Sequence, residues 1–277
     1  LVTYRNQWGT PGTYALVFDP DEKLPYEPAS FIFDESRCFI ENNVMTLNTN
    51  EGIKNLVTYA FYPAQSPEST AEINATLKLD YADKNGCNIS AGCWIRIEPD
   101  KVSLADRPSV NFALDATQWH DYRIIRSGGK IKVYVDGTLK LDASSEGLEV
   151  RNVQVGNRQV KGMNFNKIDD GEADMGWFTS STSHWKKLSV KVDNVKDYSI
   201  DWKWDANKGF PDQFRRDRIV VLDRIAATFG HCGYSGWTQM EDGTIVIADY
   251  TVGGNGGQPA NMPFIRAYVT NEEELTK

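Results

Sequence analysis

Short alternating runs bounded by turn signals are the feature that most constrains the fold of this chain. The segment from 118 to 142, QWHDYRIIRSGGKIKVYVDGTLKLD, holds three such runs with no helical periodicity between them. Ile131, Val133 and Val135 alternate with polar residues, so their side chains share one face of a strand. Ser-Gly-Gly before this run and Asp-Gly after it are hairpin signals. The segment therefore predicts a three-stranded antiparallel meander, whose apolar face a second layer must cover.

Similar runs recur along the whole chain. Turn signals separate nearly all of them, and helical periodicity is weak everywhere except at 212–229, where we expect a short helix. Many short strands without intervening helices predict an all-β, antiparallel two-sheet sandwich. The expected strands lie at 13–19, 29–34, 44–49, 56–63, 71–82, 93–99, 109–115, 153–157, 175–180, 186–198, 243–251 and 264–270.

A change in composition near residue 200 suggests how the chain is organised. The preceding part reads as ordinary sandwich strands, whereas the following part is dense in aromatic residues, Arg and Asp. We expect a single domain over 1–277, with a β-sandwich core at 28–200. Residues 201–277 would form a C-terminal elaboration that packs with 1–27, because chain ends often lie close together.

Composition excludes some classes of protein. The chain has 277 residues, 30 Lys plus Arg, 38 Asp plus Glu and a net charge of −8. An acidic chain without a basic run is a poor partner for nucleic acid, which demands cationic contacts. No stretch approaches the roughly 20 apolar residues of a membrane span. The 8 Trp and 12 Tyr residues favour sugar contact, because flat rings pack on apolar sugar faces, although large sandwiches are also rich in aromatics.

The cysteines and the start of the chain bear on processing. Cys87 and Cys93 flank a Gly- and Asn-rich turn, so a hairpin could bring them within disulfide reach, and the question stays open. Asn74-Ala-Thr and Asn88-Ile-Ser are glycosylation sequons, which favour a secreted or extracytoplasmic location. Because the first residue is Leu, we expect a processed form or a fragment of a longer protein.

The segment at 118–142 also resembles a known family. QWHDYRIIRSGGKIKVYVDGTLKLD resembles the central strands of concanavalin A-like and laminin G-like domains, and KKLSVKVDNVKDY resembles their last strand. The resemblance covers residues 28–198 and implies a jelly-roll sandwich. Such domains occur as lectins, carbohydrate-binding modules, glycoside hydrolases and polysaccharide lyases. The resemblance also implies a structural Ca²⁺ between the first and last strands, with Asp34 and Asp193 as candidate ligands.

A second, shorter resemblance lies at the two ends of the chain. LVTYRNQWGTPGTYALVFD, GYSGWTQMEDGTIVIADYT and FIRAYV resemble strands of sialidase-like proteins. The Asp-box repeats and the remainder of a propeller are absent, and a propeller needs at least about four blades. Either the chain is part of a longer protein, or these strands were adopted into the sandwich.

The C-terminal segment holds the best candidate chemistry. Arg binds carboxylates bidentately, and a neighbouring Tyr or His moves protons, so an Arg cluster with these residues suits an acidic sugar. The alternative is that each Arg pairs with a neighbouring Asp on the surface. Candidate catalytic residues are His231, Tyr234, Asp249 and Arg266, and candidate substrate-binding residues are Arg5, Arg215, Arg216, Trp237 and Tyr250.

Two further motifs are weaker candidates. His120 follows Trp119 among strand residues, where a structural role is the more natural interpretation. Glu172 and Asp174 resemble the paired carboxylates of a glycosidase, but Gly176 stands where a third acid is usual. The acidic run at 169–174 otherwise fits a solvated loop or a cation site.

Three hypotheses for the function remain. The first is an extracellular carbohydrate-active enzyme, a glycoside hydrolase or a polysaccharide lyase, that acts on a complex or acidic polysaccharide. The second is a non-catalytic carbohydrate-binding module or lectin, which needs an aromatic platform but no acid or base with a perturbed pKa. The third is a structural or interaction domain. The expected partner is an oligo- or polysaccharide, and beyond structural Ca²⁺ we expect no organic cofactor.

Overall fold

The computed structural model describes most of the chain and divides it into two compact units. The described residues are 1–6, 12–32, 35–49, 56–62, 68–83, 86–148, 152–161, 177–193, 199–224, 232–252 and 263–276. Tyr26–Gly162 and Gly176–Asp212 belong to the first, which we call the sandwich unit. Leu1–Pro25 and Gln213–Lys277 belong to the second, the terminal unit.

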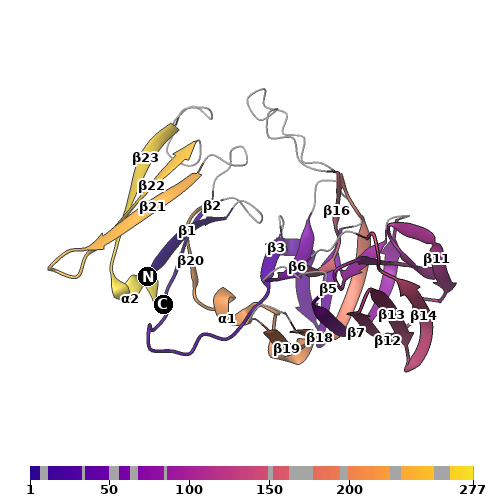
Figure 1. The fold of residues 1–277 in the computed structure, drawn as a ribbon. Helices are drawn as coiled ribbons and strands as arrows, with labels where there is room; N and C mark the ends of the chain where they lie inside the picture. The colour runs from indigo at the N-terminus through magenta and orange to yellow at the C-terminus, as the bar shows by residue number, and fades with distance from the viewer. Residues whose placement is uncertain are drawn as a thin grey trace. The chain divides into compact units, whose positions relative to one another are not determined.

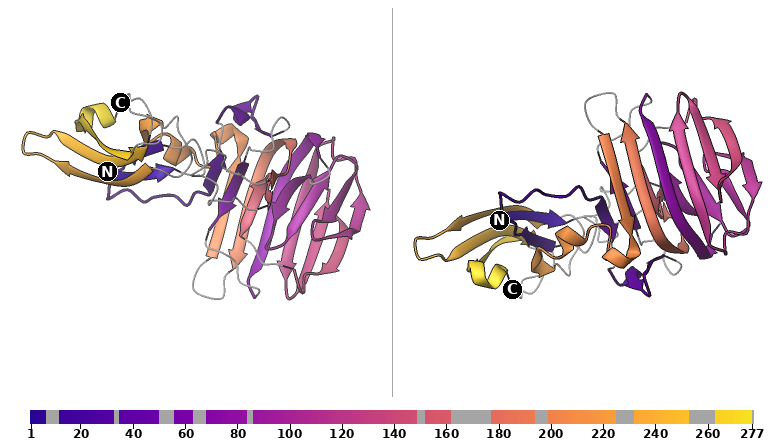
Figure 2. Two further views of the ribbon diagram at one scale, coloured as in Figure 1. Left: turned by 90° about the horizontal axis from the view of Figure 1, so that it is seen from above. Right: turned by 90° about the horizontal axis from the view of Figure 1, so that it is seen from below.

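Two antiparallel sheets build the sandwich unit (Figure 1). The larger, the back sheet, has the strand order β14-β13-β12-β7-β18-β5-β4, and β19 also pairs with β18. Figure 2 shows its long strands side by side in the view from below. Its strands are β4 (Cys38–Glu41), β5 (Val44–Asn48), β7 (Thr70–Ala82), β12 (His120–Ser127), β13 (Lys130–Val135), β14 (Thr138–Ser144), β18 (Ser181–Asp193) and β19 (Ser199–Asp205).

The other sheet, the front sheet, has the strand order β11-β10-β9-β8-β15-β6-β3. Its strands are β3 (Ala29–Ile32), β6 (Val57–Phe61), β8 (Cys87–Ser90), β9 (Trp94–Glu98), β10 (Lys101–Leu104), β11 (Arg107–Ala113) and β15 (Val153–Gly156). The remaining elements are the short hairpin β16 (Gln159–Lys161) with β17 (Trp177–Phe178) and the 3-10 turns η1 (Glu35–Arg37) and η3 (Ala206–Lys208). The sandwich therefore extends past residue 200, because β19 adds to the back sheet.

The core lies between the two sheets and follows from the alternation in the sequence. Buried and partly buried residues alternate along most of β7, which places Ile73, Leu77 and Leu79 inside. Trp185 of β18 is fully buried among them, and its indole Nε1 donates to Ser183 Oγ at 2.8 Å. One continuous apolar cluster joins both sheets, so the two-sheet antiparallel sandwich expected from the sequence is confirmed.

The meander expected at 118–142 is also confirmed. β12 pairs with β13, and β13 pairs with β14, all antiparallel. Gly128 and Gly129 have φ angles of 57° and 73° in the first turn. Asp136 and Gly137 have φ angles of 50° and 77°, as a two-residue hairpin turn of this hand requires.

The cysteines of the sandwich unit are buried. No disulfide joins Cys38, Cys87 and Cys93 in the structure, so the hairpin between Cys87 and Cys93 does not pair them. Burial raises the pKa of the Cys87 thiol to about 12 and that of Cys93 to about 11. Asn88, the acceptor of the second sequon, is itself fully buried in β8.

The terminal unit contains two small antiparallel sheets. The first has the order β1-β2-β20 and the second the order β21-β22-β23. The elements are β1 (Val2–Asn6), β2 (Gly12–Leu16), α1 (Gln213–Arg216), β20 (Ile219–Arg224), β21 (Cys232–Gln239), β22 (Ile245–Val252), β23 (Pro263–Thr270) and α2 (Glu272–Leu275). The short helix expected within 212–229 is α1, but the apolar run after it is a strand. In the part of the chain that the structure describes, no helix has the length and apolar character needed to cross a membrane.

Candidate functional site

A row of charged side chains on the outer face of the front sheet is the first candidate site. Along β9, Ile95 and Ile97 point into the core, so Trp94, Arg96 and Glu98 share the opposite face. Two neighbours complete the row, which we call the charged strip: Ser103 of β10 and Arg158, which follows β15. The strip thus combines one carboxylate, two guanidinium groups, a hydroxyl and an indole.

The members of the charged strip contact one another. Arg96 Nε lies 3.3 Å from Glu98 Oε2 and donates to Ser103 Oγ at 3.2 Å. The other oxygen of Glu98, Oε1, lies 3.5 Å from Lys101 Nζ. The Arg158 guanidinium stacks over the Trp94 ring at 5.4 Å from its centroid. A carboxylate between two cations can bind or exchange protons with a polar ligand.

The charges in this strip are unusually well buried for the outer face of a sheet. The side chains of Arg96, Glu98 and Arg158 are 12%, 9% and 14% exposed. Removing charges from water is costly even when they are paired, and apolar residues would cover such a face at lower cost. This cost makes the charged strip a candidate functional site.

Sequence reasoning missed the charged strip. The alternation in CWIRIEP correctly predicts a strand with Ile95 and Ile97 on one side. The same alternation leaves Arg96 and Glu98 as ordinary solvent-facing charges, because the burial of the outer face depends on the rest of the fold. The approach of Arg158 to Trp94 depends on the strand order of the front sheet, which no local pattern reveals.

The terminal unit brings together two of the residues singled out from the sequence. Asp249 of β22 and Arg266 of β23 face each other in the strand register, and Arg266 Nε lies 3.7 Å from Asp249 Oδ1. The Asp249 side chain is fully buried, and Thr13 Oγ1 of β2 donates to its Oδ2. The Arg266 guanidinium lies over the rings of Phe264 and Tyr268, at 5.7 and 5.4 Å from their centroids.

Other sequence candidates in the terminal unit lie apart from this pair. Trp237 of β21 is 44% exposed, opposite Ile247. Tyr250 follows Asp249 directly in β22, so its side chain points to the other face of the sheet. Arg215 and Arg216 are partly buried in α1.

Some candidates cannot be placed as side chains. His231 lies outside the described residues, and for Arg5 on β1 and Tyr234 on β21 only the strand position is described.

The metal and acidic candidates stay predictions. Asp193 is exposed at the end of β18, while Asp34 and the acidic run 169–174 lie outside the described residues. Among the residues that the structure does describe, no group of three or more His, Cys, Asp or Glu side chains is placed to hold a metal ion.

His120 has the surroundings of a structural residue. Its Nδ1 lies 2.7 Å from Asp136 Oδ2, and its Nε2 lies 3.0 Å from the carbonyl oxygen of Asp115. Both ring nitrogens are therefore engaged, one with the turn between β13 and β14 and the other with the turn that precedes β12.

Comparisons with known proteins concern the fold. No protein-family model and no curated protein sequence matches this chain. An alginate lyase from Corynebacterium sp. is similar in structure at 12% identity, with a TM-score of 0.38, over 69% of this chain and 92% of that one. The carbohydrate-binding module CBM66 from Bacillus subtilis is similar at 11% identity, with a TM-score of 0.31, over 55% of this chain and 98% of that one.

A third similar structure is a sialidase, at 15% identity, with a TM-score of 0.39, over 57% of this chain and 16% of that one. The sandwich unit has two antiparallel sheets around one shared core, which is the architecture that the sequence resemblance implied.

Proposed function

We propose that this chain is an extracellular carbohydrate-active enzyme that acts on an acidic polysaccharide at the charged strip. One observation carries the proposal: the Glu98 carboxylate is almost fully buried between Arg96 and Lys101, on the same strand face as Trp94. A flat ring offers a surface to the apolar face of a sugar, and a buried guanidinium offers a bidentate partner to a sugar carboxylate. The abundance of Trp and Tyr in the chain supports the same class of ligand.

The composition of the strip favours elimination over hydrolysis. Hydrolysis of a glycosidic bond ordinarily uses two carboxylates that flank the bond. The strip has Glu98, whereas Asp106, which lies 3.9 Å from Arg158 Nη1, is 41% exposed. Elimination needs a cation on the substrate carboxylate and one group that takes the adjacent proton. Arg96 or Arg158 would supply the cation, and Glu98 would serve as the base.

The proposed elimination conserves protons and electrons with the substrate and Glu98 alone. Glu98 takes the proton from the carbon next to the uronate carboxylate, and the electron pair of that bond forms a carbon–carbon double bond. The glycosidic C–O bond breaks on the neighbouring carbon. The proton held by Glu98 then passes to the departing oxygen, which regenerates the carboxylate. The arginine that binds the uronate carboxylate stabilises the charge that develops there.

A non-catalytic carbohydrate-binding module is the second candidate. It is favoured by the ion pairs already present, because Arg96 pairs with Glu98 and Arg158 lies near Asp106. In that case the strip would hold a glycan and leave its bonds intact. A structural or interaction domain is the third candidate and would bind no glycan.

The experiment incubates the protein with a panel of uronate-containing and neutral polysaccharides. Reducing ends and the ultraviolet absorbance of unsaturated sugars are followed together. We expect both signals to rise on a uronate polymer. Reducing ends without absorbance would replace the lyase with a hydrolase, retention on a polymer without turnover would favour the binding module, and no effect on any glycan would contradict the proposal.

The pair in the terminal unit provides an alternative location for the same chemistry. Asp249 and Arg266 combine a buried carboxylate with a guanidinium, as the charged strip does. The variant Asp249→Asn therefore belongs in the same assay. If it abolished turnover in a folded protein while Glu98→Gln did not, the reaction would take place in the terminal unit.

A further inference from the structure

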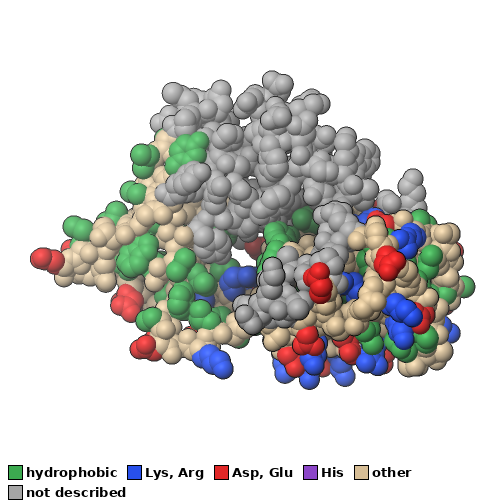
Figure 3. Space-filling model, in the orientation of Figure 1, with side chains coloured by type: hydrophobic (Ala, Val, Ile, Leu, Met, Phe, Trp, Pro, Cys, Tyr) green, Lys and Arg blue, Asp and Glu red, His purple; other side chains and the backbone are tan. Residues whose placement is uncertain are grey.

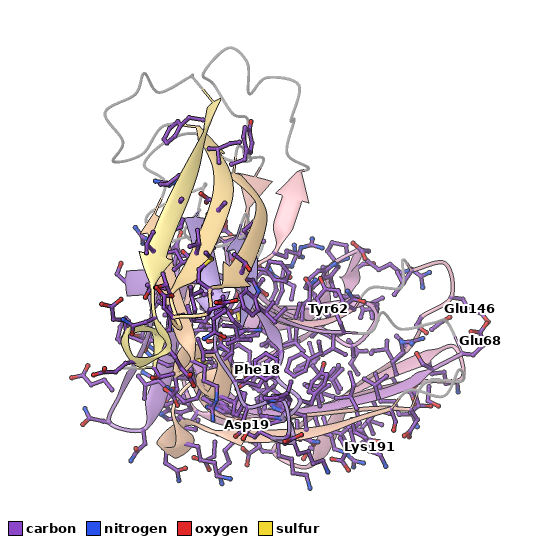
Figure 4. The ribbon with its side chains drawn as sticks, turned by 90° about the vertical axis from the view of Figure 1, so that its left-hand side faces the viewer. Phe18, Asp19, Tyr62, Glu68, Glu146 and Lys191 are labelled. Carbon is purple, nitrogen blue, oxygen red and sulfur yellow. The ribbon has the colours of Figure 1, made fainter. Side chains whose placement is uncertain are left out.

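A groove lies on the outer face of the back sheet, on the opposite side of the sandwich from the charged strip. It has a volume of about 470 Å³, which is within the range of small-molecule sites. In Figure 3, Lys, Arg, Asp and Glu side chains gather along the lower edge of the sandwich, where this face lies. Figure 4 labels Lys191 of β18 below the back sheet, on the side facing away from the front sheet.

The shape of the groove follows from the register of four strands. Arg123 of β12, Asn74 of β7, Ser189 of β18 and Lys203 of β19 stand directly opposite one another in that order. Neighbouring strands lie about 4.8 Å apart, so Arg123 and Lys203 are about 14 Å apart across the sheet. The short side chains of Asn74 and Ser189 form the floor of the groove, and the long side chains of Arg123 and Lys203 form its two walls. Tyr134 of β13, opposite Arg123, extends the wall on that side.

The charges in the groove are unequal. Its lining contains three cations, Arg123, Lys187 and Lys203, against one carboxylate, Asp121. Asp121 accepts a hydrogen bond from Thr76 Oγ1 at 2.6 Å, so it is held at the floor. Outside the groove, Glu72 accepts from Arg123 Nε at 2.8 Å.

Unlike Arg123, the two lysines of the groove have no carboxylate partner among the described residues. In the described part of the chain, no carboxylate lies within 4.0 Å of the ammonium group of Lys187 or Lys203. Asp205, which stands opposite Lys187 in the register, instead accepts a hydrogen bond from the backbone N–H of Asn207. An overall acidic chain with two unpaired lysines in one hollow is arranged to attract an anion.

We infer that this groove is a second glycan site, which binds a carboxylate-bearing sugar of an acidic oligosaccharide without cleaving it. Lys187 and Lys203 would bind the carboxylate, while Asn74 and Ser189 are placed to hydrogen-bond sugar hydroxyls. The Tyr134 ring and the aliphatic stems of the lysines offer apolar surface to the ring. The inference is independent of the chemistry proposed for the charged strip, because the two sites lie on opposite faces of the sandwich unit.

The test is calorimetric titration with a galacturonate trimer in the Glu98→Gln background, which prevents turnover at the strip. We expect the trimer to bind and a neutral galactose trimer to bind at least tenfold more weakly. Lys187→Ala combined with Lys203→Ala should lower the affinity for the galacturonate trimer about tenfold or more. The matched control is Lys130→Ala with Lys140→Ala, two exposed lysines of the same sheet, and should change the affinity less than twofold.

Several outcomes would overturn the inference. These are unchanged affinity in the Lys187/Lys203 double variant, equal binding of the neutral trimer, and equal binding of a glutamate trimer, which carries carboxylates but no sugar. If Arg96→Ala abolished trimer binding and the lysine variants did not weaken it, the ligand would bind at the charged strip instead. That result would contradict the groove as a glycan site but not the proposed function. Conversely, absence of turnover in the wild-type protein would contradict the proposed function but not the glycan site in the groove.

Discussion

The Arg126 guanidinium reaches from β12 across the interior and donates from Nε to the carbonyl oxygen of Ala91 at 3.0 Å. Its Nη2 donates to the Ser69 carbonyl oxygen at 3.0 Å and to Ser69 Oγ at 3.1 Å. The residue is 3% exposed, so these bonds replace the water that the cation lost. Arg126 thereby ties two loops to the back sheet.

Replacing Arg126 by Met should destabilise the sandwich unit by about 3 kcal/mol, because the acceptors on Ala91 and Ser69 lose a buried donor. The control is Arg123→Met, whose side chain is 50% exposed and pairs with Glu72, and which should cost less than about 1 kcal/mol. Chemical denaturation monitored by tryptophan fluorescence measures both. Similar losses for the two variants would show that the burial of Arg126 contributes little.

The contact of β15 with β6 depends on a glycine. Gly156 has a φ of +118°, and a Cβ there would clash with the carbonyl oxygen of Val57. Gly156→Ala should therefore cost about 2 kcal/mol or more in unfolding free energy. Gly128→Ala is the matched control, since Gly128 has a φ of +57° with nothing near the added Cβ, and strain alone should cost about 1 kcal/mol. Equal costs would contradict the close approach of the two strands.

Glu72 makes part of the stability dependent on pH. The hydrogen bond from Arg123 holds the pKa of the Glu72 carboxyl below its ordinary value of 4.5. A carboxyl whose pKa is lowered by folding contributes stability above its unfolded pKa and loses it as the pH falls through the folded pKa. The difference in unfolding free energy between wild type and Glu72→Gln should therefore be largest near neutral pH and should shrink below about pH 4.5.

The control for this titration is Glu41→Gln, which removes an exposed carboxylate from β4. Its difference from wild type should stay nearly constant over the same range. A Glu72→Gln difference that is equally flat would mean that the pair with Arg123 contributes nothing in solution.

The thiols of the sandwich unit should resist alkylation while the protein is folded. The thiolate is the reactive form, and burial raises the pKa of Cys87 to about 12 and of Cys93 to about 11. Mass spectrometry after brief iodoacetamide treatment should find Cys38, Cys87 and Cys93 unmodified, and modified once denaturant is added. A mass lower by two hydrogens, resistant to labelling and restored by reductant, would instead reveal a disulfide.

Local patterns predicted the strands better than they predicted the sites. Alternation at Ile131, Val133 and Val135 identifies a strand because successive side chains of a strand point to opposite faces of the sheet. The structure of the stretch 212–229 was harder to predict, because four of its residues form α1 and the following apolar run forms β20, which pairs with β2. That pairing joins residues some 200 positions apart and leaves no local trace.

The candidate sites depend on pairings that only the fold reveals. Asp249 and Arg266 were singled out by residue type, but their opposition across β22 and β23 is a matter of register. The walls of the groove are Arg123 of β12 and Lys203 of β19. These two strands belong to one sheet because β7 and β18 lie between them. Burial of Glu98 likewise comes from the tertiary structure.

The central claim, that Glu98 performs proton transfer on an acidic polysaccharide, is tested most directly by the rate of unsaturated product formation in Glu98→Gln. We predict that kcat falls at least about 100-fold, as expected on removing a general acid or base, while the melting temperature stays close to that of wild type. Glu41→Gln, which makes the same change on β4, should retain the wild-type rate. A folded Glu98→Gln variant with unchanged turnover, or a wild-type protein that forms no product from any uronate polymer, would contradict the claim.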